Sequence, residues 1–339
     1  MKKACAFVLA ASMAAFAGHA LAQGKFVDEL AEQYTQDVKG KRVAFLALST
    51  SFDLAQMWSR GMEKFAERNG IDYTVRNPNW DSQAGSQALT DLIRDKYDLL
   101  VVQNPDVQVY RKLLNRAQKA GIPVVQINLK SLQSTDAFVG AEWAELGRMQ
   151  AQIAYDWCAK EKGGSGEVAL MQGTPTNPNT LLMVQGVKDI IEQHPGQLEI
   201  VSNQVADFDA TKAHGIASTV IKQHPNLCAY IGTWDGMDLG VASAVEDAGK
   251  IKDIKVITNG GGRQPQCDRV RKGLYDAYIS YNAFRQAQDL TVTMAQLLQN
   301  GHNPDVKPYA IYTPLTVITQ ENLNDDSCWD FDKVEKTEF

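Results

Sequence analysis

Short apolar runs alternate with amphipathic segments along most of the chain. The runs that predict strands cover 42–48, 71–76, 98–103, 123–127, 167–171, 198–205, 229–232, 255–258 and 277–280. Helical spacing of apolar residues predicts helices at 24–39, 55–69, 82–95, 110–120, 142–160, 180–194, 210–223, 238–249, 265–272 and 284–300. Runs this apolar are typical of parallel strands buried on both faces. Strands that alternate with helices of about 10–15 residues indicate βαβ units.

The alternation occurs twice, so we expect an α/β fold of two Rossmann-like lobes with parallel sheets. The last long helix and an extended run at 309–318 exceed what the second half needs. The chain should therefore cross between the lobes more than once and form a multi-strand hinge around a cleft. We expect a first lobe of 23–140 plus about 282–308, a second lobe of 141–281, and a hinge-crossing segment and tail at 309–339.

The first 22 residues have a different character. Lys2 and Lys3 precede an apolar run at 4–17, and Ala20-Leu21-Ala22 matches the small-residue pattern of a cleavage site. This arrangement predicts a secretory signal peptide cleaved after Ala22 and a periplasmic protein. A retained membrane anchor would need a longer apolar run.

Export changes the interpretation of the cysteines, because exported proteins form disulfides. Removal of the signal peptide leaves Cys158, Cys228, Cys267 and Cys328. Four cysteines allow three pairings, and we favour Cys158–Cys228 with Cys267–Cys328. The alternative is four buried free thiols. No C-x-x-C spacing indicates a zinc site.

Composition narrows the function classes. The 339 residues are 44% hydrophobic and 22% charged, with a formal net charge of -6. An acidic chain without a basic patch argues against nucleic acid as a partner. We expect a monomer without cofactor or metal.

Known enzyme motifs are absent from the sequence: it has no phosphate-binding P-loop, no G-x-S-x-G and no G-x-G-x-x-G after the first strand. The histidines His194, His214, His224 and His302 are scattered, which is typical of solvated side chains. We therefore expect no catalytic residues. An exported hydrolase would need a nucleophile–base pair, and none is recognisable.

Aromatic rings and amides gather where the predicted strands end. The candidate ligand-binding residues are Phe52, Asp53, Trp80, Asn128, Phe208, Trp234, Asp235, Asn259 and Tyr281. Rings offer flat apolar faces, and Asn both donates and accepts hydrogen bonds. This combination suits an uncharged polyhydroxyl ligand such as a sugar or polyol. In the alternative interpretation, each ring packs against a loop and Asp235 caps a helix.

Four segments resemble type I periplasmic substrate-binding proteins of ABC importers, in the ribose/galactose/xylose group. They are Ile122-Pro123-Val124-Val125, Val139-Gly140-Ala141-Glu142, Ala206-Asp207-Phe208-Asp209 and Trp234-Asp235-Gly236-Met237-Asp238-Leu239-Gly240. The similarity covers roughly 41–301. It implies a protein that captures a small polar ligand between its lobes and delivers it to an ABC permease and its ATPase.

The chain departs from the usual sugar-binding pattern of that group. An Asp-Arg pair is replaced by Asn128-Leu129, an Arg by a residue near Met183, and a later Asp by Asn259. The resemblance carries over directly to Phe208 and Asp235, and by position to Asn128, Trp234, Asn259 and Tyr281. It implies that Trp234 and Phe208 stack on the ligand, while Asn128, Asp235 and Asn259 hydrogen-bond it. A modified sugar or another small polar molecule stays open as ligand.

Two other functions fit the same features. The closed form could be presented to a chemoreceptor or histidine kinase, or the ligand could be a non-carbohydrate molecule. A DNA-binding repressor, which can share this core, is excluded by the predicted signal peptide and by the lack of a helix-turn-helix segment.

Overall fold

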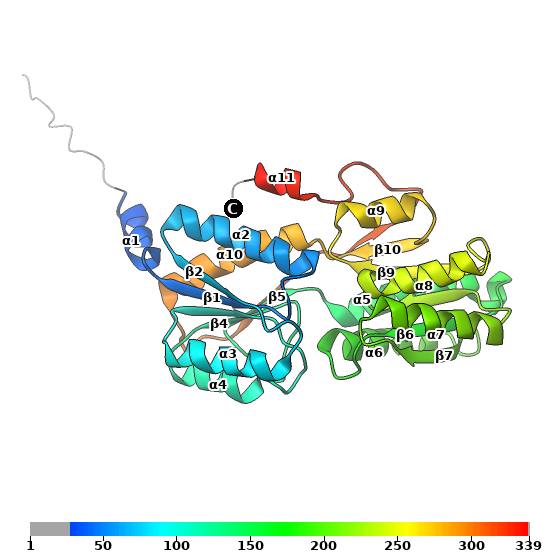
Figure 1. Ribbon diagram of the computed structural model, residues 1–339, viewed down its shortest axis with the longest axis horizontal. Helices are drawn as coiled ribbons and strands as arrows, with labels where there is room; N and C mark the ends of the chain where they lie inside the picture. Colours follow the sequence, from blue (N-terminus) through cyan, green and yellow to red (C-terminus); the bar gives the residue numbers. More distant parts are fainter. Residues whose placement is uncertain (1–27, 338–339) are drawn as a thin grey trace, which may run out of the picture.

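The computed structural model describes residues 28–337 as two α/β lobes that lie side by side (Figure 1). Each lobe contains one six-stranded sheet, so the predicted fold class is confirmed. The predicted signal peptide, residues 1–22, lies outside the described residues. Within 28–337, no helix combines the length and apolar character needed to cross a membrane.

The first lobe has the strand order β11-β5-β4-β3-β1-β2, with all neighbours parallel. Its strands are β1 (Arg42–Leu46), β2 (Asp72–Arg76), β3 (Leu99–Val102), β4 (Val124–Ile127), β5 (Ala137–Gly140) and β11 (Tyr309–Tyr312). Its helices are α1 (Glu29–Val38), α2 (Asp53–Asn69), α3 (Ser82–Arg94), α4 (Arg111–Lys119) and α10 (Ala283–Asn300). Alternate residues of β1 pack on opposite faces: Phe45 packs with α2 and α10, and Leu46 with α3 and α4.

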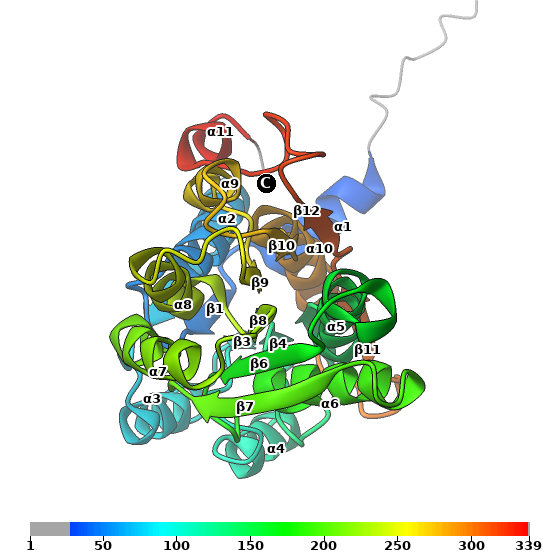
Figure 2. The same cartoon turned by 90° about the vertical axis from the view of Figure 1, so that its right-hand side faces the viewer.

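The second lobe has the strand order β12-β10-β9-β8-β6-β7. Its strands are β6 (Glu167–Gln172), β7 (Glu199–Val205), β8 (Ala229–Gly232), β9 (Lys255–Gly260), β10 (Ala277–Ser280) and β12 (Thr316–Ile318). Its helices are α5 (Trp143–Cys158), α6 (Pro178–Gln193), α7 (Ala210–Gln223), α8 (Asp235–Asp247) and α9 (Gln264–Arg271), with a short 3-10 turn at Lys160–Lys162. Helices α5 and α6 cover one face of the sheet, and α7 and α8 the other (Figure 2).

The chain crosses between the lobes after β5, after β10 and between β11 and β12. The single extended run expected at 309–318 is in fact two strands in different sheets, and β12 is antiparallel to β10. Pro314 lies between them and cannot donate to a strand ladder. The sequence also missed β5, and it began the helix α8 three residues late. The predicted domain limits themselves stay a prediction.

Both disulfides lie in the second lobe and its tail, and the favoured pairing is confirmed. Cys158 at the end of α5 bonds to Cys228 just before β8. Cys267 in α9 bonds to Cys328 in the C-terminal segment. The alternative of four free thiols is therefore wrong.

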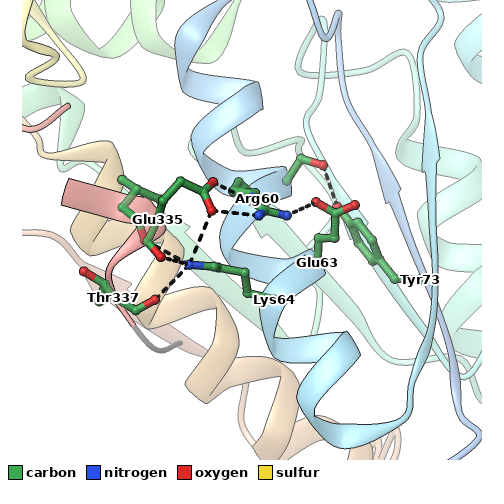
Figure 3. A network of polar contacts seen from close by, with 8 residues as sticks. Arg60, Glu63, Lys64, Tyr73, Glu335 and Thr337 are labelled. Carbon is green, nitrogen blue, oxygen red and sulfur yellow. Dashed lines mark hydrogen bonds and ion pairs between the residues drawn. The ribbon is translucent and has the colours of Figure 1, made fainter. Parts of the chain in front are cut away.

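The C-terminal segment contacts both lobes. After the Cys267–Cys328 bond, the Trp329 indole donates to the Gly261 carbonyl of the second lobe over 2.6 Å. Helix α11 (Phe331–Glu335) then lies against α2 of the first lobe. There Arg60 donates to the Glu335 carboxylate over 2.7 Å and 2.8 Å (Figure 3). The tail thus bridges the lobes on the side of α2 and α9.

Candidate ligand-binding site

A small cavity of about 40 Å³ lies between the lobes, where strands of both sheets end. Ligands of open α/β sheets bind beyond the carboxyl ends of the strands. The lining residues are Leu48, Phe52, Leu54, Trp80, Gln103, Asn128, Leu129, Asn177, Asn179, Phe208, Trp234 and Tyr281. None of these described side chains carries a formal charge.

Four rings form a continuous chain across the cavity, two from each lobe. Trp80 stacks on Phe52 with 5.4 Å between ring centroids. Phe52 meets Trp234 of the second lobe edge-on at 6.2 Å, and Trp234 meets Phe208 in the same way at 6.2 Å. Offset and edge-on pairs at these distances are favourable. The rings therefore hold the two lobes together at the cavity as well as offering faces to a ligand.

Trp80 and Phe208 occupy equivalent turns of the two lobes. Each follows the outermost strand of its sheet, β2 or β7. Each precedes an aspartate, Asp81 or Asp209, whose side chain caps the next helix. Both rings have positive φ, 68° for Trp80 and 62° for Phe208. Bulky residues rarely adopt this backbone conformation, and such strain gathers at ligand sites.

Two glycines leave room for the rings of the second lobe. A Cβ added at Gly173, just after β6, would lie 2.1 Å from the Phe208 ring. A Cβ at Gly236, in the first turn of α8, would lie 2.4 Å from the Trp234 ring. Any larger residue would displace these rings, so both glycines are needed for the close approach.

The polar part of the lining consists of amides and one phenol. Gln103, Asn128 and Asn177 are each 3% exposed, and Asn179 is 7% exposed. Tyr281 is equally buried, and burial raises the pKa of its hydroxyl well above the ordinary value, so it stays neutral. Buried polar groups of this kind must be hydrogen-bonded by the protein or by a ligand.

Asp235, which the resemblance assigned to the ligand, lies outside the lining. Its carboxylate accepts a hydrogen bond from the Tyr278 hydroxyl over 2.9 Å, and its carbonyl accepts one from Tyr275 over 2.8 Å. Burial, with a smaller contribution from Asp53, raises its pKa well above the ordinary value. The Asp235 side chain is therefore bonded within the second lobe and does not face the cavity.

Asp238, one turn later in α8, fixes the backbone at Trp234. Its Oδ2 accepts from the Trp234 backbone N–H at 3.2 Å and from the Thr258 hydroxyl at 2.6 Å. Burial raises its pKa to about 8 against the effect of both hydrogen bonds. The sequence quoted Asp238 in a motif but assigned it no role.

Two further candidates also lie outside the lining. Asp53 begins α2, and its carboxylate lies 3.9 Å from the Arg263 guanidinium of the second lobe. Burial raises the pKa of Asp53, although Arg263 opposes the shift. Asn259 is buried in β9, where its amide donates to the Gly232 carbonyl over 3.2 Å and lies 3.9 Å from the Met183 sulfur.

Six of the nine candidates thus meet at one cavity: Phe52, Trp80, Asn128, Phe208, Trp234 and Tyr281. Sequence reasoning missed the other lining residues, Leu48, Leu54, Gln103, Leu129, Asn177 and Asn179. Gln103 is the last residue of the strand predicted at 98–103. Asn177 and Asn179 lie in and just after the exit loop of β6. Counting every polar residue at a strand exit would have found these three amides.

No three His, Cys, Asp or Glu side chains gather into a metal-binding cluster in the described part of the chain. The cavity therefore offers rings, amides and hydroxyls as its recognition groups.

A family model described as "periplasmic binding protein domain" matches residues 43–303. The ribose import binding protein of Bacillus subtilis is 28% identical over 205 residues, which are 60% of this chain and 64% of that protein, slightly less than two thirds of its length. The D-ribose/D-allose-binding protein of Pseudomonas aeruginosa is 28% identical over 248 residues, 70% of this chain and 75% of that protein. A putative rhizopine-binding protein of Rhizobium meliloti is 24% identical over 271 residues, 78% and 85% of the two chains.

Solved structures share the fold. A carbohydrate transporter solute-binding protein from Agrobacterium radiobacter, in complex with D-arabinose, superposes with a TM-score of 0.74 at 17% identity, covering 88% of this chain and 99% of that one. An ABC transporter solute-binding protein from Actinobacillus succinogenes with bound D-allose has a TM-score of 0.71 at 21% identity, covering 83% and 98%.

Proposed function

The chain belongs to the periplasmic binding protein family, and from that premise we propose that it captures a sugar or polyol between its lobes and delivers it to an ABC permease with its ATPase. The protein works in the periplasm as a monomer, after cleavage of the signal peptide behind Ala22. It performs no catalysis and uses no cofactor. Trp234 and Phe208 stack on the ligand, while Asn128 positions it.

The observation that carries this proposal is the chain of four rings that spans both lobes over an uncharged, amide-lined cavity. Ring faces pack on the C–H faces of a sugar, and polar groups between them take its oxygens. A site shared by two lobes also links binding to closure, because the ligand contacts both walls only when they approach.

Contacts between the lobes around the cavity support a closing mechanism. The Asn177 amide donates to the Pro105 carbonyl over 3.2 Å, and the Val107 N–H donates to the Thr176 carbonyl over 3.4 Å. A permease that reads the closed form would thereby distinguish loaded from empty protein. The presentation of this form to the permease is part of the proposal.

A thermal-shift screen tests the function. The panel is D-ribose, D-allose, D-arabinose, D-galactose, sorbitol and inositol, with amino acids and organic acids as comparators. A ligand at 100 times its Kd adds about 2.7 kcal/mol of stability, which raises Tm by roughly 4 °C for a chain of this size. If only amino acids or organic acids raise Tm, the proposed ligand class is wrong.

Trp234→Ala tests whether the ligand binds in this cavity. The substitution removes the central ring of the chain, and we expect a loss of about 2–4 kcal/mol of binding free energy by calorimetry. Trp157→Ala is the matched control, because Trp157 is 37% exposed and lies outside the lining. Equal affinities of the two variants would exclude this cavity as the binding site.

A further inference from the structure

The strap, residues 328–337 at the C-terminal end of the described chain, is fixed to the second lobe at its first two residues. Cys328 is bonded to Cys267 in α9. The Trp329 N–H donates to the Gly262 carbonyl over 2.9 Å, and the Trp329 side chain is buried. A covalent bond does not open with thermal motion, so this end of the strap stays with the second lobe when the lobes move.

The other end of the strap is held by α2 of the first lobe through separable contacts. The Arg60 guanidinium donates to both oxygens of Glu335, and Nζ of Lys64 donates to the carbonyls of residues 334, 335 and 337 over 3.1 Å, 2.8 Å and 3.1 Å (Figure 3). Val334 is fully buried against the core of the first lobe. Ion pairs of partly exposed side chains contribute little stability, and a helix as short as α11 does not persist without its packing. This end can therefore leave α2.

The strap has little slack between its two ends. Trp329 is bonded to the second lobe and Val334 is buried in the first, with α11 beginning at Phe331 between them. Residues in a helix advance only about 1.5 Å each, against about 3.5 Å in an extended chain. If the lobes separate on this side, they must either unwind α11 or detach it from α2, and both changes release the end held by the first lobe.

The strap also contributes to an ion pair that joins the lobes. Arg263, just before α9, lies 3.9 Å from the Asp53 carboxylate at the start of α2. The Arg263 guanidinium also lies 5.2 Å from the centroid of the Phe331 ring. A cation over an aromatic face is attracted to it. One guanidinium of the second lobe thus contacts both the first lobe and the strap, so departure of the strap weakens this junction.

Helix α2 links the strap to the cavity. Phe52, its N-cap, and Leu54 in its first turn line the cavity, whereas Arg60 and Lys64 hold the strap. About 15 Å of helix axis separates Leu54 from Lys64. A helix moves as one unit, so a ligand that draws the first turn toward the second lobe also keeps the later turns beside the strap.

We propose that the strap is a latch: it docks on α2 while the lobes are in contact, leaves α2 when they part, and thereby slows the release of ligand. For its ligand this inference rests on the proposed function, to which it adds control over opening. Release is a change from order to disorder in a short helix. Since the ligand and the docked strap favour the same arrangement of the lobes, each strengthens the binding of the other.

X-ray scattering of the mature chain without ligand tests the latch. Arg60→Ala with Lys64→Ala removes the side chains that hold the strap. We expect a larger radius of gyration than in the native chain, because the open arrangement gains population. Arg94→Ala with Lys119→Ala is the matched control, since these exposed cations belong to α3 and α4 on the other face of the same sheet. Equal radii for the two double variants overturn the proposal.

The rate of ligand release gives a second measure, by stopped-flow tryptophan fluorescence. The probe is D-ribose, D-allose, D-arabinose, D-galactose, sorbitol or inositol, whichever raises Tm most. Because a sugar leaves from the open arrangement, dissociation from Arg60→Ala with Lys64→Ala should be at least about tenfold faster. An unchanged dissociation rate overturns the latch and leaves the proposed function intact. If no member of the panel binds, the proposed function fails, while the scattering result still decides whether the strap is a latch.

Cys267→Ser with Cys328→Ser frees the permanent end instead, so misfolding of one variant does not end the test. We expect a smaller rise of the dissociation rate in the same direction, because the hydrogen bonds of Trp329 remain. Cys158→Ser with Cys228→Ser removes the disulfide outside the strap and, measured well below its melting temperature, should leave the rate unchanged. Equal rates for the two disulfide variants overturn the proposal.

Discussion

The two lobes share a topology and meet at one cavity, but their walls are supported differently. The first lobe contributes Phe52, Trp80 and a network of buried amides, and its described residues up to 140 contain no cysteine. The second lobe contributes Trp234 and Phe208 above two fully buried acids, and it holds both disulfides. The two lobes therefore present similar rings to the cavity, but the residues that support these rings differ in chemistry.

This difference shows how buried acids that destabilise the folded state can be retained beside the cavity. Moving an ionised carboxyl group out of water costs free energy unless the group is paired or becomes protonated. Burial raises the pKa of both Asp235 and Asp238, that of Asp238 to about 8, so each carboxyl group binds a proton more readily, which limits that cost. The disulfides act on the other side of the equilibrium, by restricting the unfolded chain. The first lobe has no disulfide among its described residues, and its acids with a raised pKa, Asp53 and Asp289, each face an arginine.

Removal of the Cys158–Cys228 disulfide should lower the stability of the second lobe only. Cys158→Ser with Cys228→Ser opens a link between residues 70 apart, which costs about 4 kcal/mol in the chain-entropy model. We expect calorimetry to resolve a second-lobe transition at lower temperature from an unchanged first-lobe transition. One shifted cooperative transition would instead mean that the three crossings couple the lobes too tightly to unfold apart.

The paired turns of Trp80 and Phe208 give a smaller and more local effect. Trp80 is 48% exposed and stacks on Phe52, whereas Phe208 is half-buried, contacts Trp234 and fits closely over Gly173. Binding energy concentrates in the better-buried groups. Phe208→Ala should cost about 2 kcal/mol of binding free energy and Trp80→Ala less than about 1 kcal/mol, measured by calorimetry with the tightest ligand of the screen.

Gly173→Ala is the control for this pair, because it keeps the Phe208 ring but forces it from its place. It should weaken binding nearly as much as Phe208→Ala. A larger loss for Trp80→Ala than for Phe208→Ala would reverse the expected order of the two lobes.

The architecture was predictable because the alternation of strands and helices is a local signal, repeated in both halves. Strand β5 escaped because it has four residues, ends in Gly140 and has no helix of its own between it and β4. The division of 309–318 between two sheets also escaped, since strand partners are set by tertiary contacts that the run does not encode.

The site was predictable at the level of position and less so at the level of orientation. Rings at strand exits converge because the carboxyl ends of parallel strands meet at one edge. Asp235 occupies such an exit too, yet its carboxyl turns toward Tyr278, a residue 43 positions away. Gln103 was missed because its lining role depends on a hydrogen bond from Leu48, a residue on the neighbouring strand's exit. Side-chain direction is decided by partners that are distant in sequence.

The pH dependence of stability tests the fully buried acids of the second lobe. Folding raises the pKa of Asp238 to about 8, so the folded state holds its proton more tightly than the unfolded state. Stability is therefore greatest in acid and falls as pH rises from about 4 to about 8, by at most about 1.4 kcal/mol per unit for this group. Above about 8 its contribution is constant.

Asp238→Asn imitates the protonated acid. The amide oxygen can take the place of Oδ2, which accepts from Trp234 and Thr258, and the NH₂ the place of Oδ1, which has no partner among the described residues. Urea unfolding at pH 5 and pH 8 should show a shallower loss of stability than in the native chain, with a remainder from Asp235, whose pKa is raised in the same direction. The exposed Asp305→Asn serves as control and should leave the slope unchanged. If Asp238→Asn leaves the pH dependence of stability unchanged, the buried Asp238 does not destabilise the second lobe. The difference between the two lobes would then lie in the disulfides alone.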